Sequence, residues 1–377
     1  MATLTATEGI PASYIELSND SSASFNINSN VTNTTSWRQY PSSSRIVFSS
    51  FELVLASIGA VANALVFWII AKNRKMRTVP NIFVLNLSIA DFIYCSMFLP
   101  FWDSYQMSVH GWNCGRVMCN VIVAVSDLSV NASTLFLTAM SVERYRAVVD
   151  PIGHLQRQSL KKTWLVSGIL WLAAILPSLP FAVLSTTKES RIFGNTTWVS
   201  CQLDPPEGMD YAKFQIVTHM WRFLAWFVVP LVIIAPLYTL LIKKIREKEQ
   251  FPRLGPATMQ SQVRVTRMVT VVVFIFMLSW LPIHVRNIVY FFNQEAMPEG
   301  IYFLIAALSS ANSTVNPFLY ALLGENFYAY TKKALLRCCH TSRSAKQRGI
   351  TGDGTSISLS RRRTIPRETI NVDDIPI

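Results

Sequence analysis

One aspartate, Asp91, stands inside an apolar run, at the end of the segment N-L-S-I-A-D. A carboxylate is costly to bury in such surroundings, so Asp91 is a candidate functional group. Asn63 ends another apolar run, and more polar side chains stand in others. Several oxygen atoms around one carboxylate suit a hard cation, so we predict a sodium site formed by Asp91, Ser133, Asn312, Ser313 and Asn316. The alternative is a hydrogen-bonded network that only holds helices together, at about 0.6 kcal/mol per bond.

Long apolar segments must position these groups. The chain of 377 residues is 51% hydrophobic and only 15% charged, which is too apolar for a soluble protein of this size. A helix of about 20 apolar residues crosses a bilayer, and a helix pairs its own backbone groups there. We therefore predict an all-α membrane protein, a bundle of transmembrane helices at 46–71, 81–102, 117–149, 164–185, 215–242, 268–292 and 301–323. Prolines within them, such as Pro100 and Pro230, predict kinks that can act as hinges.

The distribution of Lys and Arg predicts the orientation of this seven-transmembrane bundle. The first, third and fifth connections are basic, whereas the alternate ones are acidic or mixed, with Asp103 in one and Glu295 and Glu299 in another. Basic loops stay in the cytoplasm, so the N-terminus is expected outside, in the plasma membrane. The formal net charge of +12 then reflects orientation and attraction to anionic membrane lipid. No nucleic-acid partner is expected, because the basic residues flank the helices and do not form one face.

The order of polar and apolar segments divides the chain into four parts. They are a disordered, glycosylated extracellular N-terminus (1–45), the bundle (46–324), a short cytoplasmic amphipathic helix with a palmitoylation site (325–339), and a disordered cytoplasmic tail (340–377). Residues 1–45 hold no apolar stretch long enough for a signal peptide, so the first helix is expected to direct insertion. Sequons of the form N-x-[ST] predict glycosylation at Asn19, Asn30, Asn33 and Asn195.

Cysteines fall on both sides of the predicted membrane. Cys119 opens the third helix and Cys201 lies in the outer loop before the fifth, both on the oxidising side. A disulfide between them would fasten that loop across the mouth of the bundle, although Cys114 is also outside and is the alternative partner. Cys338 and Cys339 follow the amphipathic stretch on the cytoplasmic side, where they predict palmitoylation.

Short motifs follow one another in order, each on its own predicted helix. They are G-A-V-A-N ending at Asn63, N-L-S-I-A-D ending at Asp91, S-V-E-R-Y ending at Tyr145, F-M-L-S-W-L-P with Trp280, and N-P-F-L-Y starting at Asn316. In this order they resemble the rhodopsin-like, or class A, G protein-coupled receptors, over roughly residues 48–340. Such receptors are not enzymes, and no zinc-protease motif is found on a predicted helix.

The resemblance implies a switch at the cytoplasmic end. Arg144 is similar to the family's switch arginine, which would pair with Glu143 at rest and turn toward a heterotrimeric G protein when active. The residues that the resemblance assigns to switching and G protein coupling are Glu143, Arg144, Tyr145, Tyr238, Thr266, Phe276, Trp280, Asn316, Pro317 and Tyr320. Receptor kinases and arrestin are further expected partners, acting at the Ser- and Thr-rich tail.

A closer resemblance is visible in V-R-V-T-R-M-V-T-V-V-V, W-L-P-I-H-V and G-E-N-F. These segments resemble somatostatin, opioid and invertebrate allatostatin-C receptors, which implies a peptide ligand, such as a neuropeptide, and inhibitory G proteins. Somatostatin and opioid receptors have an aspartate seven residues after the third-helix cysteine. Here Ser126 holds that position and Asp127 follows it, about 100° further around the helix. Asp127 therefore faces either the pocket or the fourth helix.

Outer-half positions on four helices predict a ligand pocket. Its residues are expected to be Trp102, Gln106, Ser126, Asp127, Trp280, His284, Asn287 and Tyr302. A wide aromatic pocket with one acid suits a peptide that carries an aromatic side chain and a basic group. Outer acids are expected to steer such a cation inward, namely Asp103, Asp204, Glu207, Asp210, Glu295 and Glu299.

Two alternative functions remain. The first is a class A receptor for a non-peptide ligand. The more remote one is a membrane transporter, which would be expected to show an internal repeat, or interrupted helices at matching positions in two halves. We find neither in the sequence. Apart from the sodium ion, no cofactor is expected.

Overall fold

The computed structural model divides the chain into two compact units, Met1–Thr331 and Lys332–Ile377. The structure describes residues 42–191, 197–246, 256–293, 297–323, 327 and 329–332. Several predicted features lie outside these residues: the sequons at Asn19, Asn30, Asn33 and Asn195, the cysteines Cys338 and Cys339, and the cytoplasmic tail.

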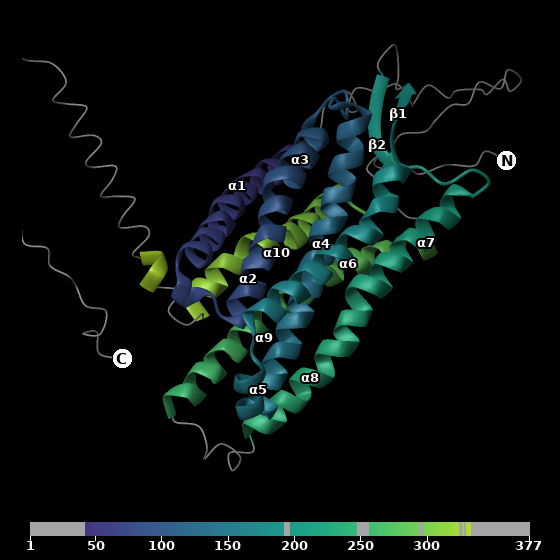
Figure 1. Cartoon of the computed structure of the whole chain (residues 1–377). Helices are drawn as coiled ribbons and strands as arrows, with labels where there is room; N and C mark the ends of the chain where they lie inside the picture. Colours follow the sequence, from purple (N-terminus) through teal and green to yellow (C-terminus); the bar gives the residue numbers. More distant parts are fainter. Residues whose placement is uncertain are drawn as a thin grey trace, which may run out of the picture. The chain divides into compact units, whose positions relative to one another are not determined.

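Long helices make up the first unit (Figure 1). Five of them are continuous: α1 (Ser43–Lys72), α4 (Gly115–Val149), α6 (Leu160–Leu184), α9 (Pro256–Asn293) and α10 (Glu299–Leu323). Two more are formed by joined segments, α2 (Val79–Ile93) with α3 (Leu99–Met107), and α7 (Tyr211–Phe223) with α8 (Val229–Arg246). The short elements η2 (Arg74–Met76) and α5 (Pro151–Arg157) lie in connections.

Hydropathy separates α10 from the other long helices. Within the described residues six helices are long and apolar enough to cross a membrane, with the joined pairs counted as single helices. The remaining one, α10, carries a buried polar face that lowers its mean hydropathy, formed by Ser309, Ser310, Asn312, Ser313, Thr314 and Asn316. Because α10 packs against α1, α2 and α9, this face lies inside the bundle and not against lipid. The predicted seven-helix bundle is confirmed.

The two joined helices contain a π-helical segment each, η3 (Tyr94–Phe98) and η4 (Leu224–Val228). In both cases a proline, Pro100 or Pro230, stands two residues beyond the end of the segment. Proline cannot donate the backbone hydrogen bond of a regular helix, and a π-turn is one backbone geometry that accommodates the missing bond. The kinks expected at these prolines therefore take the form of π-turns.

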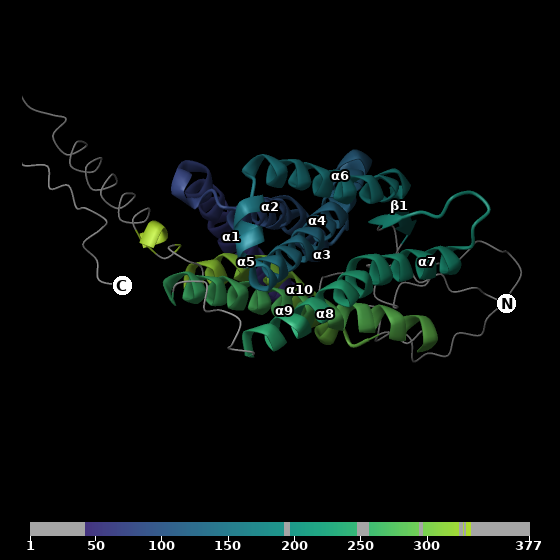
Figure 2. The same cartoon turned by 60° about the horizontal axis from the view of Figure 1, so that its bottom comes forward.

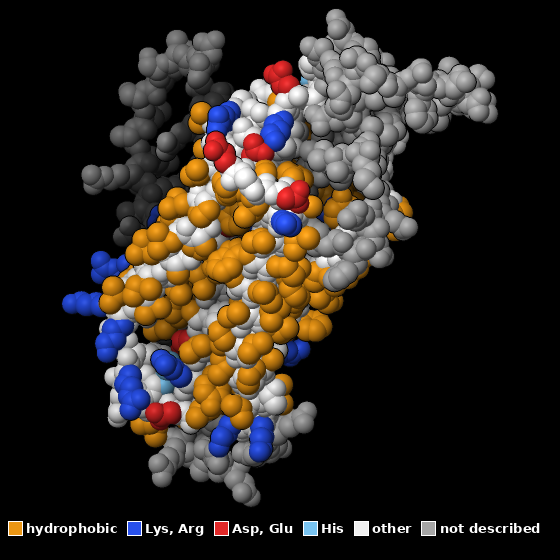
Figure 3. Space-filling model, turned by 90° about the vertical axis from the view of Figure 1, so that its right-hand side faces the viewer, with side chains coloured by type: hydrophobic (Ala, Val, Ile, Leu, Met, Phe, Trp, Pro, Cys, Tyr) orange, Lys and Arg blue, Asp and Glu red, His pale blue; other side chains and the backbone are white. Residues whose placement is uncertain are grey.

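The helix α4 runs through the middle of the bundle, where it contacts α2, α6, α8 and α9 (Figure 2). The outer surface is apolar, and large side chains such as Leu172, Leu176 and Val183 on α6 are exposed. Figure 3 shows hydrophobic side chains over the middle of one face, with charged side chains gathered toward its two ends. This arrangement is typical of a membrane protein, in which lipid hydrocarbon surrounds the middle of the molecule.

A β-hairpin is the one departure from an all-α fold in the described part of the chain. Strands β1 (Ser185–Arg191) and β2 (Thr197–Leu203) pair antiparallel after α6, with Thr187 opposite Cys201. We call this end of the bundle the hairpin end, and the opposite end, where α4 meets α5, the Arg144 end (Figure 1). The sequence predicted an outer loop here but no strands.

The prediction that Asp103 belongs to an acidic loop was wrong. The second membrane helix continues to Met107, five residues beyond the predicted end at Trp102, and Asp103 is fully buried in α3. Its carboxyl group interacts with that of Glu52 on α1, which is also buried. A solvent-exposed acid that steers a ligand cation is therefore not available at this position.

Candidate functional site

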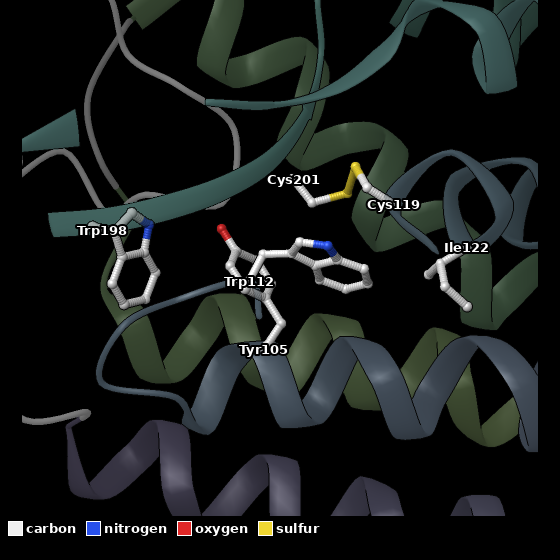
Figure 4. Close-up of a cluster of buried hydrophobic side chains, with 6 residues drawn as sticks. All are labelled: Tyr105, Trp112, Cys119, Ile122, Trp198 and Cys201. Atoms are coloured by element: carbon white, nitrogen blue, oxygen red, sulfur yellow. A yellow bond between two sulfur atoms is a disulfide. The ribbon is translucent and has the colours of Figure 1, made fainter. Parts of the chain in front are cut away.

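The hairpin end is closed by a layer that the disulfide Cys119–Cys201 holds in place. The bond joins the first turn of α4 to β2, as predicted, and Cys114 remains an exposed free thiol. Figure 4 shows the disulfide beside a buried cluster that includes Tyr105, Trp112 and Trp198. Aromatic residues dominate this layer because they bury large areas with few rotatable bonds.

The segment between α3 and α4 is attached to the same strand by backbone contacts. Trp112 N–H donates to the Val199 carbonyl at 2.8 Å, and Val199 N–H donates to the His110 carbonyl at 3.0 Å. Gly111, which pairs with Val199 in an isolated bridge, has a φ of 79°, a value that favours glycine. The β-hairpin, the disulfide and the segment between α3 and α4 thus form a single layer.

A cavity of about 190 Å³ lies within the bundle, between α4, α7, η4 and α9. Its lining consists of Ser126, Asp127, Val130, Asn131, His219, Arg222, Trp226, Phe227, Phe276, Trp280, Ile283, His284 and Asn287. Most of the lining surface is apolar, and polar and charged side chains converge on it from α4, α7 and α9. Such a composition is typical of ligand pockets.

Five of the eight predicted pocket residues line this cavity: Ser126, Asp127, Trp280, His284 and Asn287. The other three do not. Trp102 packs between Phe98 and Tyr105, with ring centroids 5.8 and 5.5 Å away. Gln106 is buried in α3, and Tyr302 on α10 lies 4.8 Å from the Arg286 guanidinium.

Asp127 is held by partners from within the protein. Arg222 Nε on α7 donates to Asp127 Oδ1 at 3.0 Å, and Asn131 Nδ2 donates to Oδ2 at 3.1 Å. The same Asn131 nitrogen is 3.0 Å from Ser178 Oγ on α6. Asp127 therefore lies at the cavity wall and is also linked to the fourth membrane helix, so both orientations that the sequence left open are partly realised.

Sequence reasoning missed Arg222, His219 and Asn131. A signal for Arg222 was present, because a cation inside an apolar segment is expensive and requires a partner. His219 and Asn287 connect α7 to α9 across the cavity, with His219 Nδ1 and Asn287 Nδ2 3.0 Å apart. His284 lies against Phe223 and Phe227, at centroid distances of 5.4 and 5.1 Å.

Asp91 lies deeper in the bundle, fully buried at the centre of a polar network. Asn316 Nδ2 donates to its Oδ2 at 2.8 Å, and Ser133 Oγ donates to its Oδ1 at 3.4 Å. Three side-chain oxygens have no hydrogen-bond partner among the described residues: Oδ1 of Asn63, Asn312 and Asn316. No Lys, Arg or His pairs with Asp91 within the described part of the chain.

At the Arg144 end, Arg144 forms a buried ion pair with the neighbouring Glu143. The other carboxylate oxygen of Glu143 is 3.1 Å from His154 Nε2, on α5. Three hydroxyl groups among the assigned switch residues, those of Tyr238, Thr266 and Tyr320, are buried and have no hydrogen-bond partner in the described part of the chain. Glu143 thus connects α4 to α5, a link through His154 that sequence reasoning missed.

Comparisons with known proteins agree with this arrangement. The family model described as 7 transmembrane receptor (rhodopsin family) matches residues 62–320. Somatostatin receptor type 5 of Bos taurus is 34% identical over 300 residues, covering 78% of this chain and 77% of that protein. Somatostatin receptor type 4 of Rattus norvegicus is 35% identical over 286 residues, 75% of this chain and 71% of its own length.

A third relative, somatostatin receptor type 2 of Sus scrofa, is 32% identical over 317 residues, 81% of this chain and 82% of that protein. The match thus covers most of both chains in each case. It includes the helices that carry the buried carboxylate, the ion pair and the cavity. The chain therefore belongs to the rhodopsin family of seven-transmembrane receptors, the class A G protein-coupled receptors, and is a multi-pass membrane protein of the somatostatin receptor branch.

Proposed function

We propose that this receptor is activated by an extracellular peptide and signals through inhibitory G proteins. The observation that carries the proposal is the aromatic cavity beneath the disulfide-bonded layer, in a chain whose relatives are named somatostatin receptors. Disulfides persist on the oxidising side of a membrane, which supports an extracellular hairpin end and an extracellular N-terminus. The Arg144 end then faces the cytoplasm, and the plasma membrane is the expected location.

The cavity is smaller than a peptide, so only part of the ligand would enter it. An aromatic side chain of the ligand would pack against Trp280 and His284 at the cavity wall. The remainder would extend toward the hairpin end, where Trp102, Gln106 and Tyr302 stay candidate contacts of a longer ligand. Movement of Trp280 against Phe276, whose rings are 6.2 Å apart, would pass the signal along α9.

The experiment is a screen of neuropeptides on cells that express the chain, with activation of an inhibitory G protein as the readout. For an activating peptide, replacement of His284 by Ala should lower potency at least tenfold, because the side chain lines the cavity. Replacement of His110 by Ala is the matched control, since this histidine is exposed at the hairpin end. Activation by non-peptide ligands alone would reject the peptide proposal in favour of the first alternative.

We also propose a sodium ion at Asp91, with Ser133, Asn312, Ser313 and Asn316 as the surrounding residues. The buried carboxylate without a cationic partner and the unpaired amide oxygens of Asn312 and Asn316 support a hard cation with oxygen ligands. Among the described residues no three His, Cys, Asp or Glu side chains gather in one cluster. A single carboxylate with neutral oxygens suits a monovalent ion better than a divalent one.

The remaining proposed partners act at the cytoplasmic side. The buried, unpaired hydroxyls of Tyr238 and Tyr320 support a role as alternative partners of Arg144 in the active state. Receptor kinases and arrestin would act on the tail at 340–377, and lipid would attach at Cys338 and Cys339. Glycosylation at the four sequons completes the proposal for the extracellular side.

A further inference from the structure

The charged pair in the cavity has unequal hydrogen-bonding capacity left on its two sides. Both carboxylate oxygens of Asp127 are engaged, one by Arg222 and the other by Asn131, and only 6% of its side chain is exposed. A carboxylate offers about four acceptor sites, so two remain, but they belong to a side chain that is nearly buried. A ligand amine that approaches Asp127 would therefore compete with Arg222 and Asn131 for an acid that the protein already engages.

Arg222 is in the opposite situation. Its Nε donates to Asp127, and its guanidinium carbon lies 4.4 Å from the centre of the Phe181 ring. Within the described residues no hydrogen bond is made by its two terminal nitrogens, which carry four of the five N–H donors of the group. The side chain lines the cavity and is 27% exposed, so these donors are accessible from it.

The rest of the lining offers no second carboxylate. Its other titratable side chains are His219, which is 3.0 Å from Asn287, and His284, which packs among Phe223, Phe227 and Trp280. Most of the accessible, unused hydrogen-bonding capacity of the charged pair therefore belongs to the planar guanidinium of Arg222. Such a group binds a carboxylate through two parallel hydrogen bonds, a geometry that Lys cannot reproduce.

We propose that the pocket anchors a carboxylate of the ligand on the terminal nitrogens of Arg222, and that no basic group is anchored on Asp127. The carboxylate can come from a peptide C-terminus or from an acidic side chain. Asp127 then positions Arg222 by holding its Nε, and Phe181 supports the flat face of the guanidinium. This inference rests on the proposed peptide ligand and specifies which group of it enters the cavity.

The test uses synthetic hexapeptides that contain Phe or Trp, with G protein activation in cells that express the full chain as readout. Each peptide is made as a free acid and as a C-terminal amide, and with either Glu or Gln at one internal position. We expect amidation, or the change of Glu to Gln, to lower potency at least tenfold. Which of the two changes matters identifies the source of the carboxylate.

Receptor variants then assign the contact. The Arg222→Gln substitution should abolish the preference for the acidic form, and Arg222→Lys should restore it only in part because the forked geometry is absent. The matched control is Arg116→Gln, an exposed arginine near the start of α4 that is not part of the cavity lining and should leave the preference intact. Because Arg222→Gln leaves Asp127 without a cationic partner, the double variant with Asp127→Asn is tested beside it, and surface expression is measured for each.

The results distinguish failure of the carboxylate anchor from failure of the peptide proposal. If peptides activate the receptor with no preference for an acidic form, the carboxylate anchor is overturned while the peptide proposal stands. The same holds if basic peptides alone lose potency on Asp127→Asn, because that result makes Asp127 the anchor. If no peptide activates while a non-peptide ligand does, the peptide proposal fails and the anchor fails with it.

Discussion

Gly111 shows how one residue without a side chain can hold a whole layer in place. Its φ is 79°, and a Cβ at this position would lie 2.2 Å from the Val199 carbonyl oxygen. We therefore expect Gly111→Ala to separate the inter-helix segment from β2 and to lower surface expression and ligand binding strongly. Gly208 is the matched control, since its φ is 81° but a Cβ would meet nothing within 4 Å.

Gly208→Ala tests backbone strain alone, which costs about 1–2 kcal/mol for a left-handed residue. Surface expression is measured by antibody labelling of intact cells, and binding by radioligand saturation. If both alanine variants behave alike, the contact with Val199 contributes nothing beyond strain.

Asp91 is the residue for a test of the sodium proposal. A cation that favours the resting packing lowers agonist affinity, and linkage makes the effect reciprocal. We expect 100–150 mM sodium to reduce agonist affinity severalfold in wild type and to have no effect in Asp91→Asn. Potassium at the same concentration controls for ionic strength. Sodium sensitivity that persists in the variant would place the ion elsewhere.

The cavity residues show the limit of prediction from sequence at this scale. Residue type was sufficient to select Asp91, because an acid is unusual in an apolar segment, and Cys119 was selected by its side of the membrane. Trp280 was assigned only through the family resemblance. The partner of Asp127 could not be predicted, since Arg222 is 95 positions away and meets it only after two helices have packed. A rotation of about 100° per residue also makes the direction of any one side chain uncertain.

At the scale of elements, hydropathy predicted the positions of all seven helices, and most ends differ by five residues or fewer. The exception is α9, which begins at Pro256, twelve residues before the predicted start at Met268. Hydropathy failed at the end of the second, where Asp103 continues the helix. A charged residue normally marks the end of a membrane segment, whereas here the acid is buried against Glu52 from another helix. The π-turns and the hairpin were likewise missed, because tertiary contacts and not local composition decide them.

The contact between α1 and α3 leads to a stability prediction. Glu52 and Asp103 are 2% and 0% exposed, and their nearest polar neighbours include Tyr94 and Ser310. Two ionised carboxylates repel each other at short range in a low dielectric, so this buried pair is stable only with a proton shared between them. We therefore expect Asp103→Asn to keep the melting temperature of the purified receptor at pH 7.5 within about 3 °C of wild type, because the amide supplies the donor that the shared proton supplies in the wild type.

Asp204→Asn is the control, since this acid is exposed and paired with Lys188 at 2.6 Å. A larger fall in the melting temperature of Asp103→Asn at pH 7.5 would show that the pair stabilises the bundle as it stands.

For the whole molecule, the cavity and the Arg144 ion pair lie on one helix. Asp127 and Arg144 are about 25 Å apart along α4, at 1.5 Å per residue. We expect Arg144→Ala to leave peptide affinity within about twofold of wild type and to abolish G protein activation. Radioligand binding and nucleotide exchange on the G protein measure the two properties separately. Normal nucleotide exchange by this variant would exclude Arg144 as the coupling residue.

The π-turns have a consequence for the evolution of the chain. Each places one residue more in a turn than a regular helix would hold, so loss of one residue from Tyr94–Phe98 or Leu224–Val228 can be absorbed by a return to regular helix. Such a deletion would leave the side chains on the hairpin side facing as they do now, whereas the same deletion in a regular helix would turn them by about 100°. The layer and the cavity wall could therefore keep their arrangement after a single-codon deletion in either segment, although the register of the sequence shifts by one residue there. Pocket positions of relatives should be transferred across Pro100 and Pro230 only after this register has been checked.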